Sequence, residues 1–430
     1  METSFTALDW SYTTNIYEVN LRQYTAEGTF DAFAKELPRL RDMGVEILWF
    51  MPITPISLEK RLGTLGSYYA CADYTATNPE FGSVDDFRSL VKKAHDLGFK
   101  VLIDWVANHT GWDHKWTREY PEYYRRNLDG NFYDSNGWED VIDLNYDNPA
   151  LRKTMIESMR FWVNECDIDG FRCDMAMLVP LDFWKEARAL LDADKKLFWL
   201  AECEEIDYHQ VFDASYAWKF LHKMEAYWKQ HTDMHGLNDV LQYYSDMFPS
   251  TAFRALFTTN HDENSHSGSE YERLGESSKA FALLCSTWNG IPLIYSGQEL
   301  PNRKRLKFFD KDQIDWNGSY ELHDFFKTIL HLRKNNPALR AGDVAVKTYR
   351  LHTDADHMIF SYLRRNENHE VLVILNLSGN DWVTFELKDK EVSGTFKEIF
   401  TGEEKSFTFD RQVEMSAWGY KLYEKIHIKD

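Results

Sequence analysis

The chain has 430 residues, with 49 Lys and Arg against 69 Asp and Glu, which gives a formal net charge of -20. So acidic a chain repels phosphate backbones and anionic lipid, which excludes nucleic acid and membrane surfaces as partners. Hydrophobic residues make up 43% of the sequence, enough for a large core, and no unbroken apolar run of about 18 residues marks a membrane span. The composition favours a globular protein that binds a neutral or cationic small ligand.

The first 340 residues alternate short apolar runs with segments of helical period, the pattern of parallel strands joined by crossover helices. Thr29 can cap a helix that Gly44 ends, between strands expected at 15–19 and 45–50. Ser83 begins the next helix, and Asn148, followed by a proline, begins another. The remaining strands of this part are expected at 101–106, 169–174, 198–202, 211–216, 255–260 and 291–296.

Eight strands, each followed by a helical stretch, predict an α/β fold, a (β/α)8 TIM barrel over residues 1–106 and 146–340. Residues 107–145 are polar, turn-rich and aromatic, and predict a short excursion after strand three. The helices then stop, so residues 341–430 predict a C-terminal antiparallel β domain. Its strands are expected at 371–375, 382–387, 395–400 and 415–423.

Three carboxylates close or follow predicted barrel strands, where the functional residues of this fold are expected. Asp174 ends the stretch GFRCD, Glu202 ends FWLAE, and Asp262 follows FTTNH. A charged group at such a position either pairs with a buried basic group and holds the barrel mouth together, or takes part in chemistry. All three are therefore candidate catalytic residues.

The surroundings of Asp174 and Glu202 predict different protonation states. Arg172 and Asp174 lie two apart on one strand, so their side chains point the same way, and the cation should lower the pKa of Asp174 and keep it ionised. Glu202 has no basic neighbour on its strand and lies near Trp199, so an apolar setting should raise its pKa. An ionised nucleophile beside a protonated acid is the arrangement used in glycoside hydrolysis.

Two histidines border strand ends, His109 in DWVANH and His261 in TTNHD. Each is either a hydrogen-bonded core histidine or a donor to the hydroxyls of a bound ring, and two of them at one barrel face weaken the first interpretation. The chain also has 15 Trp, 23 Tyr and 28 Phe, and aromatic rings suit the flat C–H faces of sugars.

These motifs together resemble those of the α-amylase family, retaining glycoside hydrolases that act on α-glucans. The four short regions of the family are matched in order by DWVANH (104–109), GFRCDMA (170–176), FWLAE (198–202) and TTNHDEN (258–264). The segments GSYYACADYTATNPEFGS (66–83) and IPLIYSGQE (291–299) resemble those at strands two and eight, so the resemblance covers essentially the whole chain. It implies that the excursion is the family's domain B and the terminal β region its domain C.

The resemblance implies that Asp174 is the nucleophile, Glu202 the general acid and base, and Asp262 the transition-state stabiliser. The implied reaction is hydrolysis of α-1,4-glucosidic bonds in malto-oligosaccharides or starch, with retention, through a covalent glycosyl-enzyme. There are two alternatives. One is a transglycosylase or isomerase of the same family, and the other is a non-catalytic carbohydrate-binding or interaction protein. The same sugar site would be lined by Tyr69, His109, Arg172 and His261.

Calcium-dependent members of the family are expected to use an asparagine such as Asn108, an aspartate such as Asp143, and the backbone of a histidine soon after the nucleophile. Met177 and Leu178 stand where the Lys-His pair would be. Two candidate ligands are fewer than the about six to eight oxygens of a calcium shell. We therefore expect no required cofactor and a calcium site that is doubtful at most.

The five cysteines are an odd number without CxxC spacing, so neither a disulfide framework nor a zinc cluster is indicated. The opening METSFTALDW has no basic region followed by an apolar stretch, so no signal peptide is visible. The sequence as given predicts a cytoplasmic protein, although a periplasmic or secreted protein with its leader removed would read the same. The pattern carries no indication of oligomeric state or of endo against exo action.

Overall fold

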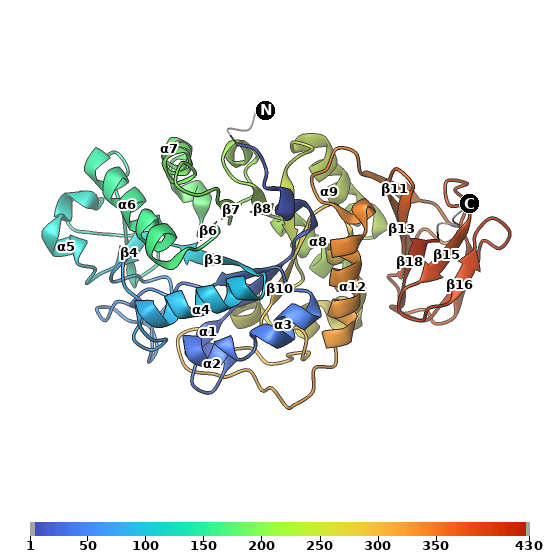
Figure 1. Ribbon diagram of the computed structural model, residues 1–430, viewed down its shortest axis with the longest axis horizontal. Helices are drawn as coiled ribbons and strands as arrows, with labels where there is room; N and C mark the ends of the chain where they lie inside the picture. Colours follow the sequence, from blue (N-terminus) through green and yellow to red (C-terminus); the bar gives the residue numbers. More distant parts are fainter. Residues whose placement is uncertain (1–4, 427–430) are drawn as a thin grey trace.

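The computed structural model describes residues 5–426. Its centre is a closed barrel of parallel strands in the order β1-β10-β9-β8-β7-β6-β3-β2, which confirms the predicted fold (Figure 1). The barrel strands are β1 (Ile16–Val19), β2 (Ile47–Phe50), β3 (Lys100–Trp105), β6 (Gly170–Cys173), β7 (Phe198–Ala201), β8 (Ala214–Tyr216), β9 (Phe253–Leu256) and β10 (Ile291–Tyr295). The helices connecting them are α1 (Leu21–Tyr24), α2 (Phe30–Ala34), α3 (Leu37–Met43), α4 (Val84–Asp96), α6 (Pro149–Cys166), α7 (Leu181–Leu191), α8 (Trp218–Trp228), α9 (Met234–Met247), α10 (Glu270–Leu274), α11 (Ser278–Thr287) and α12 (His323–Asn335).

Side-chain caps begin three helices where the sequence predicts them. Thr29 accepts a backbone hydrogen bond at α2, Ser83 forms a capping box at α4, and Asn148 caps α6. The single helix expected from Thr29 to Gly44 is instead the pair α2 and α3. Pro38 explains the break, because it has no N–H to donate and its ring clashes with the carbonyl of the residue four positions earlier.

Two barrel strands are displaced from their predicted positions. The strand expected at 211–216 begins only at Ala214, and the one expected at 255–260 begins at Phe253 and ends at Leu256. The hydrogen-bonded register between β8 and β9 sets where both strands begin, because Ala214 lies opposite Phe253. Residues 257–260 therefore lie outside the barrel strands, and Asp262 directly precedes the π-helical turn Glu263–Ser267.

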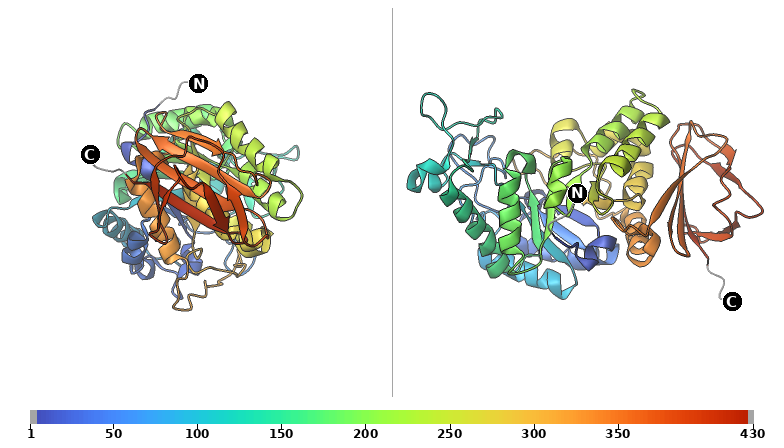
Figure 2. Two further views of the ribbon diagram at one scale, coloured as in Figure 1. Left: turned by 90° about the vertical axis from the view of Figure 1, so that its right-hand side faces the viewer. Right: turned by 90° about the horizontal axis from the view of Figure 1, so that it is seen from above.

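The excursion at 107–145 has a small structure of its own. β4 (His109–Gly111) pairs antiparallel with β5 (Val141–Asp143), and α5 (Trp116–Glu119) lies between them in the chain. Because β4 follows β3 almost directly, this pairing brings the end of the excursion back to the barrel mouth. Figures 1 and 2 show the excursion and the C-terminal sheet at opposite ends of the molecule.

The C-terminal region is antiparallel, as predicted, with a sheet ordered β11-β12-β13-β18-β15-β16 and a separate pair β14-β17. Its strands are β11 (Lys347–Leu351), β12 (Ile359–Asn366), β13 (His369–Asn376), β14 (Val383–Glu386), β15 (Thr395–Glu398), β16 (Glu404–Ser406), β17 (Gln412–Met415) and β18 (Tyr420–Lys425). The strand expected at 415–423 is two strands, because Trp418 turns the chain with a left-handed φ of 53°. The domain boundaries after residues 106, 145 and 340 remain our proposal, which limited proteolysis would test.

All five cysteines are buried and free. No helix within residues 5–426 combines the length and the apolar character needed to cross a bilayer.

Gly170 gives the barrel a point of close strand contact, between β6 and β7. A Cβ at this position would lie 1.9 Å from the backbone oxygen of Phe198, an overlap that only moving one strand could relieve. We therefore expect Gly170→Ala to lower the free energy of unfolding by at least about 1–3 kcal/mol, the usual cost of overpacking a core. Urea unfolding followed by circular dichroism measures it.

Gly379→Ala is the matched control, because its added Cβ would meet only Trp418, at 3.8 Å. Its unfolding free energy should stay within about 0.5 kcal/mol of the unsubstituted protein. Equal stabilities for the two variants would mean that β6 and β7 are not in the tight contact described.

Candidate active site

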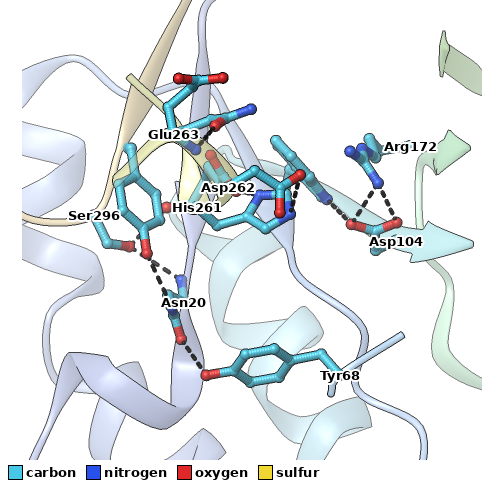
Figure 3. A network of polar contacts seen from close by, with 12 residues as sticks. Asn20, Tyr68, Asp104, Arg172, His261, Asp262, Glu263 and Ser296 are labelled. Carbon is cyan, nitrogen blue, oxygen red and sulfur yellow. Dashed lines mark hydrogen bonds and ion pairs between the residues drawn. The ribbon is translucent and has the colours of Figure 1, made fainter. Parts of the chain in front are cut away.

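The buried Arg172 on β6 is shared by three carboxylates at the barrel mouth. It pairs in register with Asp104 on β3, and its Nη1 lies 2.9 and 3.2 Å from the two oxygens of that carboxylate. The same Nη1 donates to Oδ1 of Asp174 at 3.0 Å. Nη2 lies 3.0 Å from Oε2 of Glu202, as an ion pair without hydrogen-bond alignment. Figure 3 shows Arg172 against Asp104.

Burial sets the protonation of the two central acids, which are 6% and 5% exposed. It raises the pKa of Asp174 to about 6, against the opposing effect of Arg172. The expectation that Arg172 would bring this pKa below its ordinary value is therefore wrong, since desolvation outweighs a cation that three carboxylates share. Burial raises the pKa of Glu202 to about 8, the direction expected from the sequence. Arg172 beside Glu202 was not expected.

His261 connects the loop after β9 with the strand β1. Its Nδ1 pairs with Glu18, a fully buried residue of β1, and its Nε2 lies 2.8 Å from the Tyr69 hydroxyl. The same Nε2 lies 3.3 Å from Oδ2 of Asp262 (Figure 3). Burial lowers the pKa of His261, but the carboxylates of Asp262 and Glu18 outweigh it and raise this pKa to about 9. His261 is thus a buried cation at neutral pH that holds Tyr69 and Asp262 in place.

A cavity of about 520 Å³ opens above these groups. Its walls come from the barrel mouth, from the end of the excursion and from the loops after β2 and β10. Of the residues predicted for the site, Tyr69, His109, Asp174, Glu202 and Asp262 line this cavity. Arg172 and His261, which were also expected to line it, lie beneath its surface, 0% and 1% exposed. The lining residues are Leu62, Ser67, Tyr69, His109, Gly137, Trp138, Glu139, Asp140, Val141, Asp174, Met175, Glu202, Asp262, His266, Phe308 and Phe309.

Aromatic rings shape this cavity. Tyr69 stacks on His261 with centroids 5.4 Å apart, and its hydroxyl donates to Asp104 at 3.0 Å. Trp138, from the excursion, meets His109 edge to face at 5.3 Å. Both rings thus line the same cavity as Asp174 and Glu202.

Sequence reasoning missed several residues of this site. Asp104 and Glu18 carry a signal that could have found them, since each is a carboxylate with apolar residues on both sides in its strand, KVLIDW and IYEV. Trp138 and Phe308 carry none, because they lie on loops whose course the local sequence does not reveal. His266, in the π-helical turn Glu263–Ser267, carries none either.

The two candidate calcium ligands, Asn108 and Asp143, each make a hydrogen bond within the protein. Asp143 accepts hydrogen bonds from the backbone and hydroxyl of Ser135 through Oδ2, while its Oδ1 is buried without a hydrogen-bond partner. The Asn108 amide pairs with Nδ1 of His109 at 3.2 Å. Among residues 5–426, no group of three or more His, Cys, Asp or Glu side chains is placed to hold a metal.

Comparison with known proteins places this site in a family. The family model for the alpha amylase catalytic domain matches residues 11–133 and 124–340, and the model for the alpha amylase C-terminal all-beta domain matches residues 349–420. The alpha-amylase MalA of Haloarcula japonica is 29% identical over 385 residues, which cover 85% of this chain and 56% of that protein. The chain thus spans about half the length of this relative.

Two solved structures are similar over almost their whole length. An alpha-amylase from Lactobacillus plantarum superposes with a TM-score of 0.87 at 28% identity, covering 97% of this chain and 100% of that one. A noncanonic maltogenic alpha-amylase, AmyB from Thermotoga neapolitana, gives a TM-score of 0.85 at 30% identity and covers 96% of both chains. The chain belongs to the alpha-amylase family and is an enzyme of the glycoside hydrolase type.

Proposed function

We propose that the enzyme hydrolyses α-1,4-glucosidic bonds of malto-oligosaccharides or starch with retention of configuration. One observation carries the proposal: Asp174 and Glu202 flank a single guanidinium at the cavity floor, with pKa values raised to different extents. At neutral pH one of them is then ionised while the other holds a proton. Two carboxyl groups in these states are what a retaining glycosidase needs.

In the first step the Asp174 carboxylate attacks the anomeric carbon while Glu202 gives its proton to the departing glycosidic oxygen. A glycosyl ester on Asp174 results. In the second step Glu202 takes a proton from water, the water oxygen bonds to the anomeric carbon, and the Asp174 carboxylate leaves. Two inversions restore the original configuration, and the two carboxyl groups are expected about 5–5.5 Å apart.

The remaining site residues support these steps in our proposal. Asp262, whose side chain is 40% exposed, accepts hydrogen bonds from ring hydroxyls as charge develops on the sugar. Tyr69 stacks under the same ring and His109 donates to its hydroxyls. The Met175 N–H donates to Oε2 of Glu202 at 2.9 Å and so orients the acid.

A time course with maltoheptaose, followed by chromatography, tests the proposed activity. Hydrolysis should give only products shorter than the substrate, with one new reducing end for each bond cleaved. Products longer than the substrate would indicate a transglycosylase, and a product of unchanged mass an isomerase. An unchanged substrate would contradict the proposal altogether.

The pH profile of kcat/KM should be a bell with its maximum near neutrality. The rate needs Asp174 ionised, so it falls as the pH drops below about 6. It also needs Glu202 protonated, so it falls as the pH rises above about 8. The two limbs belong to the interacting pair and not to either residue alone. Initial rates at constant ionic strength measure the profile, and an acidic limb near an ordinary Asp pKa of about 3.9 would contradict it.

We propose further that turnover needs no bound metal, because the two candidate ligands do not complete an oxygen shell. Dialysis against EDTA should leave both the melting temperature and the initial rate almost unchanged. A fall of many degrees that calcium alone restores would show that Asn108 and Asp143 do hold an ion.

We also propose that the enzyme acts in the cytoplasm, because five free cysteines are typical of proteins in reducing compartments. Immunodetection in separated cell fractions tests this location.

A further inference from the structure

Two loops meet beside the cavity and close one of its sides. Leu65 N donates to the Phe309 carbonyl at 2.9 Å, and the backbone N of Thr64 donates to Oδ1 of Asp310 at 2.9 Å. The Thr64 hydroxyl donates to the same carboxylate oxygen. Gly63 packs so tightly that an added Cβ would lie 2.5 Å from the Phe309 Cβ. We call residues 62–66 together with residues 308–310 the loop wall.

Two side chains that follow β1 fix the loop wall from below. Arg22 is fully buried, donates to the backbone carbonyls of Gly66 (3.1 Å) and Phe308 (3.5 Å), and forms an ion pair of 2.9 Å with Glu80. Gln23 donates from Nε2 to two carbonyls of the loop after β10, at 2.9 and 2.7 Å. Opening the wall would leave a buried guanidinium short of acceptors, which is costly. The wall is therefore a fixed part of the fold.

The strand order places the loop wall on the opposite side of the barrel mouth from Glu202, the proposed general acid. In the closed order β1-β10-β9-β8-β7-β6-β3-β2, strands β1 and β7 stand opposite each other. The loop wall joins the loops after β2 and β10 above β1, whereas Glu202 directly follows β7. A general acid lies beside the leaving group. The leaving chain therefore departs towards β7, and the part of the substrate retained on Asp174 extends towards β1 and the wall.

The wall also contacts Tyr69, the ring proposed to stack under the reacting sugar. The Phe308 ring stacks against His261 and Tyr69, with centroids 6.2 and 6.3 Å apart, and both Phe308 and Phe309 line the cavity. We infer that the loop wall closes the glycone end of the cleft. The enzyme then removes a short unit of constant length from the non-reducing ends of α-glucan chains. This inference rests on the proposed hydrolysis at Asp174 and Glu202.

A pair of maltoheptaosides tests the inference on the unmodified enzyme. One has a free non-reducing end, and in the other an ethylidene group blocks O4 and O6 of the terminal sugar. Mass spectrometry of early products should show one short product length from the free substrate, and the blocked substrate should react at least about tenfold more slowly. Internal cleavage of the free and the blocked substrate at equal rates would overturn the inference that the loop wall closes the cleft. The proposed hydrolysis would remain supported. No cleavage of the free substrate would instead overturn the proposed hydrolysis.

A shortened loop gives the second test. Replacing residues 62–64 by a single glycine removes the packing of Gly63 on Phe309 and the hydrogen bonds of Thr64 to Asp310, and should speed cleavage of the blocked substrate about tenfold. Asp315→Ala is the matched control, since this residue lies in the same connection after β10 with its side chain 78% exposed. Its ratio of blocked to free rates should equal that of the unmodified enzyme. A folded short-loop variant with that same ratio would overturn the inference, and if the variant does not fold, the substrate pair decides alone.

Discussion

Asp174→Ala and Glu202→Gln should each abolish turnover while the chain stays folded. Without Asp174 no glycosyl ester forms, and without a proton on Glu202 the leaving oxygen departs as an unprotonated alkoxide. General acid catalysis contributes about 10²–10⁴ in rate, so Glu202→Gln should lose at least that much for an unactivated leaving group. Asp174→Ala should lose more, since it stops the first covalent step.

Both variants should remain folded, because Arg172 keeps Asp104 as a partner at 2.9 Å when one of the other acids is removed. Initial rates measured beside thermal melting separate chemistry from folding. Asp182→Asn is the control, an acid whose side chain is 68% exposed and whose ion pair lies outside the cavity. It should keep full activity. A folded Asp174→Ala enzyme with near-normal rates would leave these acids a purely structural role.

Arg172→Leu should reduce kcat/KM by at least one to two decades, because a charge-assisted hydrogen bond contributes about 1.5–3 kcal/mol. Arg172 lowers the pKa of both Asp174 and Glu202, in opposition to burial. Its loss should therefore move both limbs of the pH profile upward. The acidic limb, which lies near pH 6 with the arginine in place, should move to higher pH, and part of the missing rate should return as the pH is raised.

Arg172→Lys distinguishes the effect of the positive charge at position 172 from the effect of the planar guanidinium geometry. A lysine keeps the positive charge but loses the planar fork that contacts several carboxylates at once. It should bring the acidic limb back towards that of the unmodified enzyme while kcat stays low. An acidic limb that does not move in Arg172→Leu would contradict the claim that this guanidinium controls the ionisation of Asp174.

Much of the fold could be predicted because its determinants are local. Thr29, Ser83 and Asn148 begin helices through hydrogen bonds to residues two or three positions away, and buried strands show as apolar runs. The carboxylates Asp174 and Glu202 were found because strand ends are readable and barrel topology places all strand ends at one face.

The remainder depends on contacts between distant segments. The pKa of Asp174 could not be predicted from Arg172 alone, since Asp104 and Glu202 share the same cation from neighbouring strands. Strands β11 and β12 read as KTYRL and IFSYLRRN, and their charged residues hide the β pattern. Phe308 lies at the cavity in a loop that Arg22 and Gln23 hold from a distant part of the chain, and no spacing in the sequence reveals these contacts.

The configuration of the first product tests the central claim most directly. Proton NMR during the first minutes of hydrolysis, before mutarotation equilibrates the anomers, reports which face of the anomeric carbon the water attacked. Two displacements through a glycosyl ester on Asp174 predict the α-anomer first. The β-anomer first would mean a single direct attack by water, with Asp174 serving as a base, and would contradict its assignment as the nucleophile.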